Sequence, residues 1–283
     1  MSGPSSTHRL SGWLLAAPAL GLLVLAFLWP MLTLARMSFN ETSDTGAMIE
    51  AWSLSTYARL AADSFNWRLT LDSLSLSAFA AAAAVILGYP MALFLFRTRS
   101  RFRTLLTIMA IAPLLVSGTA RVIGWLAILG DHGLINAVLA SVGLPTVPLI
   151  NNLAGVRIGL TESVMPYTIL ALLAGFGRLD ARLEEAAATL GARPMQAFWR
   201  VTFPLTFPAV SAGWLLAFAL SISAFITPHL MGGGRVFVLA TEIYDAATQT
   251  LDWPAAAALS IYALVLLLIL MAAHAAVTRR LTS

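Results

Sequence analysis

Six long apolar runs dominate this 283-residue chain and restrict what it can fold into. A bilayer core about 30 Å thick needs roughly 20 mainly apolar residues as helix, and a helix satisfies its own backbone hydrogen bonds in lipid. Hydrophobic residues make up 59% of the chain and charged residues only 11%. We predict an all-α membrane protein, a single domain over residues 1–283 with six spans near 13–35, 73–96, 105–129, 154–176, 206–228 and 255–277.

The arginines between the spans predict the orientation of the chain. All 17 basic residues are Arg, and short cytoplasmic connections are enriched in positive charge. One set of connections, with the two termini, holds Arg9, Arg97, Arg99, Arg101, Arg103, Arg178, Arg182, Arg193, Arg200, Arg279 and Arg280. The opposite connections hold Arg36, Arg59, Arg68 and Arg235, offset by acidic residues. Both termini are therefore predicted to be cytoplasmic.

The residue types that are missing exclude several kinds of chemistry. A phosphate-binding P-loop needs a Lys that reaches the nucleotide phosphates, and this chain has no Lys. Without Cys, the chain has no disulfide, thiolate metal site or Cys nucleophile, and its four His lack ligand spacing. We expect no catalytic residue, metal or cofactor in this chain, so any ATP hydrolysis must come from another subunit.

Residues 177–204, between the fourth and fifth predicted spans, predict a stiff helix–turn–helix. The run RLDARLEEAAATL is rich in strong helix formers, and Gly191 after it suits a left-handed helix cap. Pro194 can open a second helix, because a Pro in the first turn loses no hydrogen bond. Pro204 is predicted to break that second helix before the fifth span.

The same segment resembles the coupling loop of ATP-binding-cassette importer permeases. It holds a Glu-Ala-Ala triplet from Glu185, a Gly six positions after that Glu, and then Val201, Phe203 and Pro204. Phe203 stands where the family usually has Leu and keeps its bulk. In that family the loop fits a groove on the ATPase and transmits its nucleotide-driven closure. The resemblance implies ATPase coupling for Glu184, Glu185, Ala186, Ala187, Gly191 and Pro204.

Residues 112–139 and 223–260 resemble permeases of the spermidine/putrescine branch. The resemblance implies a multi-pass permease of a type I importer in the bacterial inner membrane, moving a small solute such as spermidine or putrescine. It also implies an ATPase dimer that binds ATP and Mg, a second permease that is a related but different chain, and an extracytoplasmic substrate-binding protein. Membrane lipid is also an expected partner, and no nucleic-acid partner is expected. Another small amine or an aminophosphonate stays open as cargo.

Charges within spans are costly and so suggest function. Arg121 and Glu162 lie at similar depths in the third and fourth predicted spans, about 12 Å from one surface at 1.5 Å per residue. One interpretation is a structural ion pair that fixes helix packing. The other places Glu162 on the substrate pathway with Arg121, Trp125 and Tyr167, where charge and aromatic faces attract an amine.

The connections on the other side of the membrane carry fewer motifs. Residues 37–72 form the longest loop, with a short amphipathic helix predicted within 51–63, and residues 130–153 are expected to be irregular or re-entrant. A helix end followed by a tight turn is predicted around Thr227, Pro228, Gly232 and Gly233. This turn is either an outer gate or a simple helix stop.

Two other classes of protein remain as alternatives. A self-sufficient secondary transporter or channel needs no docking loop, and an intramembrane enzyme needs a carboxylate pair, a His cluster or a nucleophile with its base. The charges within the predicted spans, Arg121, Arg157 and Glu162, supply no such set. The sequence does not identify the cargo, because selectivity in such importers resides largely in the binding protein.

Overall fold

A computed structural model describes residues 7–43, 47–98, 100–177, 179–180 and 182–282, and the side chains of this set apart from 7–16 and 279–282. Arg99 and Arg178 lie outside the described residues, as do the side chains of Arg9, Arg279 and Arg280. The chain divides into two units: Met1–Asp63 with Ile243–Leu264, and Ser64–Glu242 with Val265–Ser283.

Six candidate spans confirm the predicted all-α membrane architecture. Helices long and apolar enough to cross a bilayer are Ala17–Met37, Ser64–Arg97, Gly118–Ser141, Leu153–Phe176, Pro194–Ile222 and Trp253–Thr278. Five of the six predicted spans fall largely within these segments, and the third differs.

The first unit joins one long helix to a small cap. Helix α1 (Thr7–Met37) leads into a two-stranded antiparallel hairpin, β1 (Glu41–Thr42) and β2 (Met48–Ile49), and then α2 (Ser55–Ala62). The short helix predicted within 51–63 is therefore present. Asp252 holds the cap together, because it accepts a hydrogen bond from Thr42 at 2.6 Å and lies 3.5 Å from Arg59.

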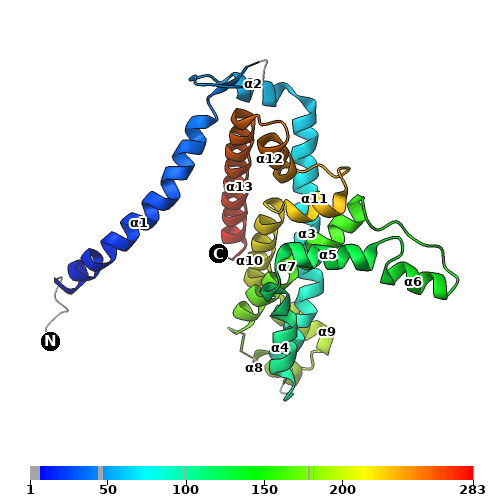
Figure 1. Cartoon of the computed structure of the whole chain (residues 1–283). Helices are drawn as coiled ribbons and strands as arrows, with labels where there is room; N and C mark the ends of the chain where they lie inside the picture. Colours follow the sequence, from blue (N-terminus) through cyan, green and yellow to red (C-terminus); the bar gives the residue numbers. More distant parts are fainter. Residues whose placement is uncertain (1–6, 44–46, 99, 178, 181, 283) are drawn as a thin grey trace. The chain divides into compact units, whose positions relative to one another are not determined.

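The second unit is built on three helices that pack against one another: α3 (Ser64–Arg97), α7 (Leu153–Phe176) and α10 (Phe203–Ile222). Small residues let their backbones approach closely. Ala80, Ala81 and Ala84 of α3 are fully buried, and a side chain at Gly175 of α7 would collide with Ala209 of α10. Figure 1 shows the three helices side by side.

Shorter elements surround these three helices. They are α4 (Arg103–Ile111), the 3-10 helix η1 (Ala112–Leu115), α5 (Gly118–Leu129), α6 (Leu134–Ser141), α8 (Arg182–Thr189), α9 (Pro194–Ala197), the π-helical turn η2 (Phe198–Thr202) and α11 (Ile226–Gly232). Helices α12 (Leu239–Thr248) and α13 (Trp253–Thr282) each begin in one unit and end in the other.

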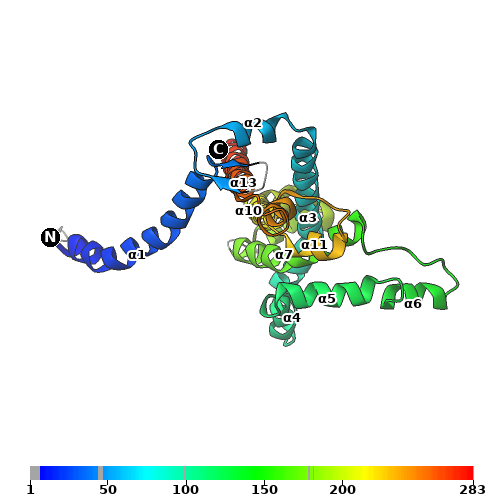
Figure 2. The ribbon, with the colours of Figure 1, turned by 45° about the horizontal axis from the view of Figure 1, so that its top comes forward.

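The predicted third span, 105–129, is not one continuous helix. Pro113 lacks a backbone N–H, and the chain leaves the helix after η1, with Val116 in an extended conformation. Ser117 then caps α5, because its side chain accepts a hydrogen bond from the Ala120 backbone at 3.2 Å. Residues 130–153, expected to be irregular, contain helix α6, which Figure 2 shows following α5. The candidate span here is Gly118–Ser141.

Candidate functional site

The segment 177–204, called here the coupling segment, forms the predicted helix–turn–helix at one end of the second unit. Figure 1 places α8 and α9 at that end, beside α4. Helix α8 ends in a left-handed cap at Gly191, whose φ is 84°. The Gly191 N–H bonds Ala188 and the Ala192 N–H bonds Ala187, at 2.9 and 3.0 Å, which satisfies two carbonyls at the helix end. Pro194 opens α9 in a first-turn position.

Pro204 does not break the second helix, contrary to the prediction. The chain stays helical from α9 through η2 into α10, and Pro204 lies in the first turn of α10. A π-helical turn widens the backbone hydrogen-bond pattern by one residue. Because η2 ends directly before α10, Pro204 lies in the first turn of α10. A helix tolerates the missing N–H of a Pro in that turn.

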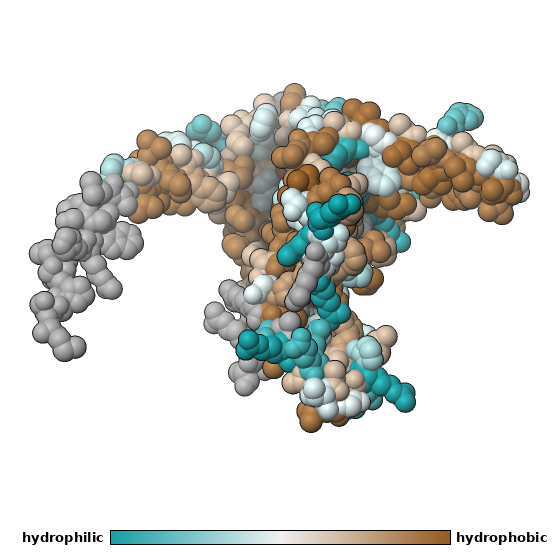
Figure 3. All heavy atoms as spheres, turned by 90° about the horizontal axis from the view of Figure 1, so that it is seen from below, coloured by the Kyte–Doolittle hydropathy of each residue, from teal (hydrophilic) through white to brown (hydrophobic). Residues whose placement is uncertain are grey.

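One face of the coupling segment is apolar and exposed. Leu190 has 89% of its surface exposed and Met195 67%, while Ala186 and Gly191 are also exposed. The exposed Glu185 makes no side-chain hydrogen bond or ion pair within the described part of the chain. Figure 3 views the molecule from this end, where hydrophilic side chains gather among hydrophobic ones. An apolar face with a free carboxylate is suited to contact another protein.

Glu184 lies differently from its neighbour Glu185. Its side chain is 26% exposed, and its Oε1 accepts hydrogen bonds from Arg97 of α3 and Thr202 of η2, each at 2.5 Å. Glu184 therefore contacts its own helical unit, and only Glu185 of the two is free to receive a partner.

Arg121 of α5 and Glu162 of α7 are brought together inside the second unit, at 3.5 Å between Nη1 and Oε1. Their side chains are 14% and 20% exposed. The hydrogen bonding is incomplete, because Arg121 Nε and Nη1 and Glu162 Oε2 are buried without a hydrogen-bond partner among the described residues. A buried ion pair with missing hydrogen bonds recovers only part of its desolvation cost.

A cavity of about 260 Å³ lies beside this pair. Arg121 and Tyr167 line it, together with the hydroxyl-bearing Ser163, Ser223 and Thr227. Glu162 and Trp125 do not line it, and Trp125 packs on a hydrophobic cluster instead. The pathway residues predicted from depth are thus only partly brought together. The polar lining consists of a guanidinium and hydroxyls, which suits a group that accepts hydrogen bonds.

Two residues that line the cavity were not predicted from the sequence, and neither was one contact between helices. Ser163 follows Glu162 and lies four positions before Tyr167, so helical spacing alone places it on the Tyr167 face of α7. Ser223 lies in the break between α10 and α11, which the sequence did not reveal because the run stays apolar. The Arg157 guanidinium stacks on the Phe79 ring at 4.8 Å, a contact between helices that sequence spacing does not show.

The predicted helix end at the other side of the second unit is present and is locked to a neighbouring loop. Thr227 and Pro228 are buried in α11, which ends at Gly232 and is followed by Gly233 with φ 55°. The Asn151 N–H, itself at φ 58°, bonds the Met231 carbonyl at 2.9 Å. A side chain at Gly233 would collide with Asn151. The glycine is therefore needed for the two loops to meet.

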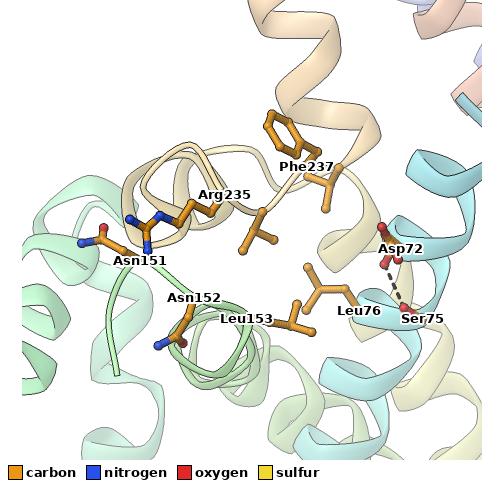
Figure 4. A pocket seen from close by; sticks show the side chains of 10 residues that line it. Asp72, Ser75, Leu76, Asn151, Asn152, Leu153, Arg235 and Phe237 are labelled. Atoms are coloured by element: carbon orange, nitrogen blue, oxygen red, sulfur yellow. Dashed lines mark hydrogen bonds between the residues drawn. The ribbon is translucent and has the colours of Figure 1, made fainter. Parts of the chain in front are cut away.

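These two loops form one wall of a pocket of about 450 Å³, shown in Figure 4. Asp72 and Ser75 of α3 lie on one side, with Asn151 and Arg235 on the other. Neither Asp72 nor Arg235 takes part in an ion pair with another described residue. The pocket thus presents one charge of each sign to a ligand or partner.

Comparison with known proteins places this architecture in a family. Residues 84–283 match the family model described as "Binding-protein-dependent transport system inner membrane component". The spermidine/putrescine transport system permease protein PotB of Escherichia coli strain K12 is 32% identical over 243 residues, 85% of this chain and 88% of that protein. The molybdenum transport system permease protein ModB of Mycobacterium bovis is 35% identical over 203 residues, covering 72% and 74%.

A solved structure shares the fold. The bacterial alginate ABC transporter, crystallised in complex with an alginate pentasaccharide-bound periplasmic protein, contains a chain that matches with a TM-score of 0.76 at 21% identity. The match covers 98% of both chains. Six apolar helices and a helix–turn–helix before the fifth agree with a family match over most of the chain. The chain accordingly belongs to the binding-protein-dependent transport system inner membrane components, the multi-pass permease subunits of ATP-binding-cassette importers.

Proposed function

We propose that this permease takes its energy from a separate ATPase dimer that docks on the coupling segment. The observation that carries this proposal is the exposed face around Glu185, with Ala186 and Gly191 permitting close approach and Leu190 and Met195 offering apolar contact. ATP and Mg belong to the ATPase subunits. The arginine distribution supports a cytoplasmic position for this segment and for both termini.

We further propose the remaining partners of the importer in the bacterial inner membrane. A second, related permease completes the pathway, and lipid surrounds both. An extracytoplasmic binding protein delivers the cargo to the opposite end. There the pocket between Asp72 and Arg235, with the adjoining Gly232–Gly233 turn, offers a surface for the binding protein. ATP binding brings the coupling segments together and opens the pathway to the loaded receptor, and hydrolysis resets it.

For the cargo we propose a small polyamine such as spermidine or putrescine. The support is the similarity to the spermidine/putrescine permease, which extends over 85% of this chain. Tyr167 offers an aromatic face to a passing ammonium group within the cavity. Glu162 is covered by Arg121, so an amine that uses this carboxylate must first displace the guanidinium.

One observation favours an anionic cargo as a second candidate. Arg121 and four hydroxyl groups line the cavity without a carboxylate, which suits an oxyanion. The similarity to a molybdenum transport permease over 72% of the chain is consistent with this chemistry. The two candidates differ in the sign of the cargo's charge, so one binding experiment separates them.

The cargo is identified through the binding protein. The permease is solubilised in mild detergent, the proteins that copurify with it are identified, and the binding protein among them is titrated calorimetrically with spermidine, putrescine and molybdate. Saturable amine binding supports the polyamine proposal. Binding of molybdate alone would overturn it and favour the oxyanion.

Docking is tested by a charge reversal on the free carboxylate. Glu185→Arg is expected to abolish copurification of the ATPase while the permease remains in the membrane. Glu50→Arg, at an exposed carboxylate outside the coupling segment, is the charge-matched control and should keep the ATPase bound. Normal ATPase recovery and normal uptake in the Glu185 variant would remove the coupling segment from its proposed role.

A further inference from the structure

The two adjacent glutamates of α8 have separate surroundings, and Glu184 is the one directed into the bundle. One oxygen of its carboxylate receives both the Arg97 guanidinium and the Thr202 hydroxyl. Arg97 is the last residue of α3, and Thr202 is the last residue of η2, directly before α10. One side chain of the coupling segment thus holds the ends of two core helices at once.

The contact continues from Thr202 into the helical core. The Thr206 hydroxyl donates to the Thr202 carbonyl at 2.9 Å, and the Tyr89 hydroxyl lies 2.9 Å from the same Thr206 oxygen. Thr206 has a single hydroxyl proton, so Tyr89 is the donor when Thr206 bonds the carbonyl. Tyr89, Thr202 and Thr206 are all buried, which shields these hydrogen bonds from water.

Aromatic rings surround this chain of hydrogen bonds. The Tyr89 ring packs edge-on against Phe176 of α7 and Phe198 of η2, at 5.3 and 5.9 Å between centroids. Phe203 lies 6.1 Å from Tyr89, and Trp199 lies 5.2 Å from Phe203. The bulk that Phe203 adds in place of the usual Leu is thus used in packing. The segment is anchored to α3, α7 and α10 by one polar chain and one aromatic cluster.

The π-helical turn η2 is the part of this anchor where the backbone hydrogen bonding departs from the α-helical pattern. π-helical turns are rare and often occur at functional sites. Their backbone hydrogen bonds span one residue more than those of an α-helix. In η2 the turn lies between α9 of the coupling segment and α10 of the core, and its last residue bonds Glu184. A displacement of α8 therefore acts on the ends of α3 and α10 through the Glu184 carboxylate, in addition to the packing of α8 against η2.

We propose that Glu184 is a positioning residue that transmits movement of the docked coupling segment to α3 and α10, whereas Glu185 serves docking. Glu184 acts through Arg97 and Thr202 and does not touch the ATPase. This inference rests on the proposed docking of the ATPase, and the adjacent glutamates allow the two ideas to fail separately.

The test uses the complete importer in proteoliposomes, with loaded binding protein outside and ATP inside. Three quantities are measured for each variant: ATPase bound, ATP hydrolysed and radiolabelled spermidine imported. Glu184→Ala should keep the ATPase bound and hydrolysing while imported spermidine per ATP falls about tenfold, the scale of a lost hydrogen bond to a charged group. Glu184→Gln, which keeps the acceptor oxygen, should recover most of that loss.

Thr202→Val supplies a second route to the same link if Glu184→Ala does not assemble. It replaces the hydroxyl with a methyl group of similar size, and it should lower spermidine imported per ATP with normal ATPase binding. Glu185→Ala is the contrast and should lose the ATPase itself. Loss of ATPase binding in Glu184→Ala, or normal import per ATP in both Glu184→Ala and Thr202→Val, would overturn the proposal. Retention of the ATPase in Glu185→Ala would instead count against docking.

Discussion

The Arg121–Glu162 pair places two charges inside the second unit with most of their surface hidden. Removing one partner leaves the other buried and uncompensated, which costs roughly 3–5 kcal/mol, whereas replacing both with apolar side chains of similar volume is close to neutral. Glu162→Gln should therefore lower the melting temperature in detergent, and the apolar double variant Arg121→Met with Glu162→Leu should restore it. A double variant no more stable than Glu162→Gln would show that the pair contributes little to packing.

The same variants separate a structural role from a role in the pathway. If the pair only fixes α5 against α7, the double variant should import cargo at the normal rate once its stability is restored. A stable double variant with altered cargo affinity would instead place these charges on the pathway. Uptake kinetics beside the melting curves give both results.

Glu41 in the cap of the first unit should make that cap sensitive to acid. Hydrogen bonds from Ser53 and Ser55 to its carboxylate lower the pKa of Glu41 below its usual value. A lowered folded pKa means that the stabilisation is present above the unfolded pKa, about 4.3, and is lost as pH falls through the folded pKa. The protection factors of the amides in residues 47–55, which compare exchange with the intrinsic rate at each pH, should therefore fall below about pH 4. In Glu41→Gln this acid-induced loss of protection should be absent, and a variant with the same pH profile as the natural sequence would contradict the assignment.

Among the elements, the end of α8 depends on a single backbone conformation. Gly191 has open space around it, so its φ of 84° is the only obstacle to a side chain. Gly191→Ala should cost about 1–2 kcal/mol at the cap and reduce ATPase binding. Gly124→Ala, within α5 and also in open space, is the control and should be neutral or stabilising. Proteolysis of the coupling segment reports the local effect, and equal protection in both variants would contradict it.

Local chemistry predicted the elements whose causes lie within a few residues. Gly191 and Pro194 each mark a helix boundary, and the structure places both as expected. The errors arose where distant residues decide the outcome. Pro204 is tolerated because η2 adjusts the backbone before it, and the third span is broken at Pro113, where hydropathy alone reads as continuous.

In the candidate site too, features with local causes could be predicted from the sequence, and contacts between distant residues could not. The apolar coupling face around Glu185 follows from a local motif. The partners of Glu184 do not, because Arg97 lies 87 positions away along the chain. The similar depths of Arg121 and Glu162 in the spans correctly predicted that these residues lie together. Depth did not predict that Trp125 and Glu162 are absent from the cavity lining, because the rotation of a helix decides which of its side chains face inward.

At the scale of the whole molecule, the chain is one subunit of a larger machine. Its six apolar helices and its family make it a membrane-spanning permease subunit, and in our proposal the coupling segment receives the ATPase while the pocket between Asp72 and Arg235 faces the binding protein. A standard P-loop needs a Lys, which this sequence lacks, so the proposal places ATP hydrolysis on a separate subunit. A secondary transporter of similar hydropathy would instead work alone.

ATP-dependent uptake of radiolabelled spermidine into proteoliposomes distinguishes an ATPase-driven importer from a transporter that works alone. The permease pair is reconstituted with and without the ATPase, the loaded binding protein and ATP. An importer driven by a separate ATPase should accumulate spermidine only when all of them are present, and Glu185→Arg should abolish that accumulation. Accumulation by the permease without ATPase or ATP, driven by an ion gradient, would contradict ATPase-driven import.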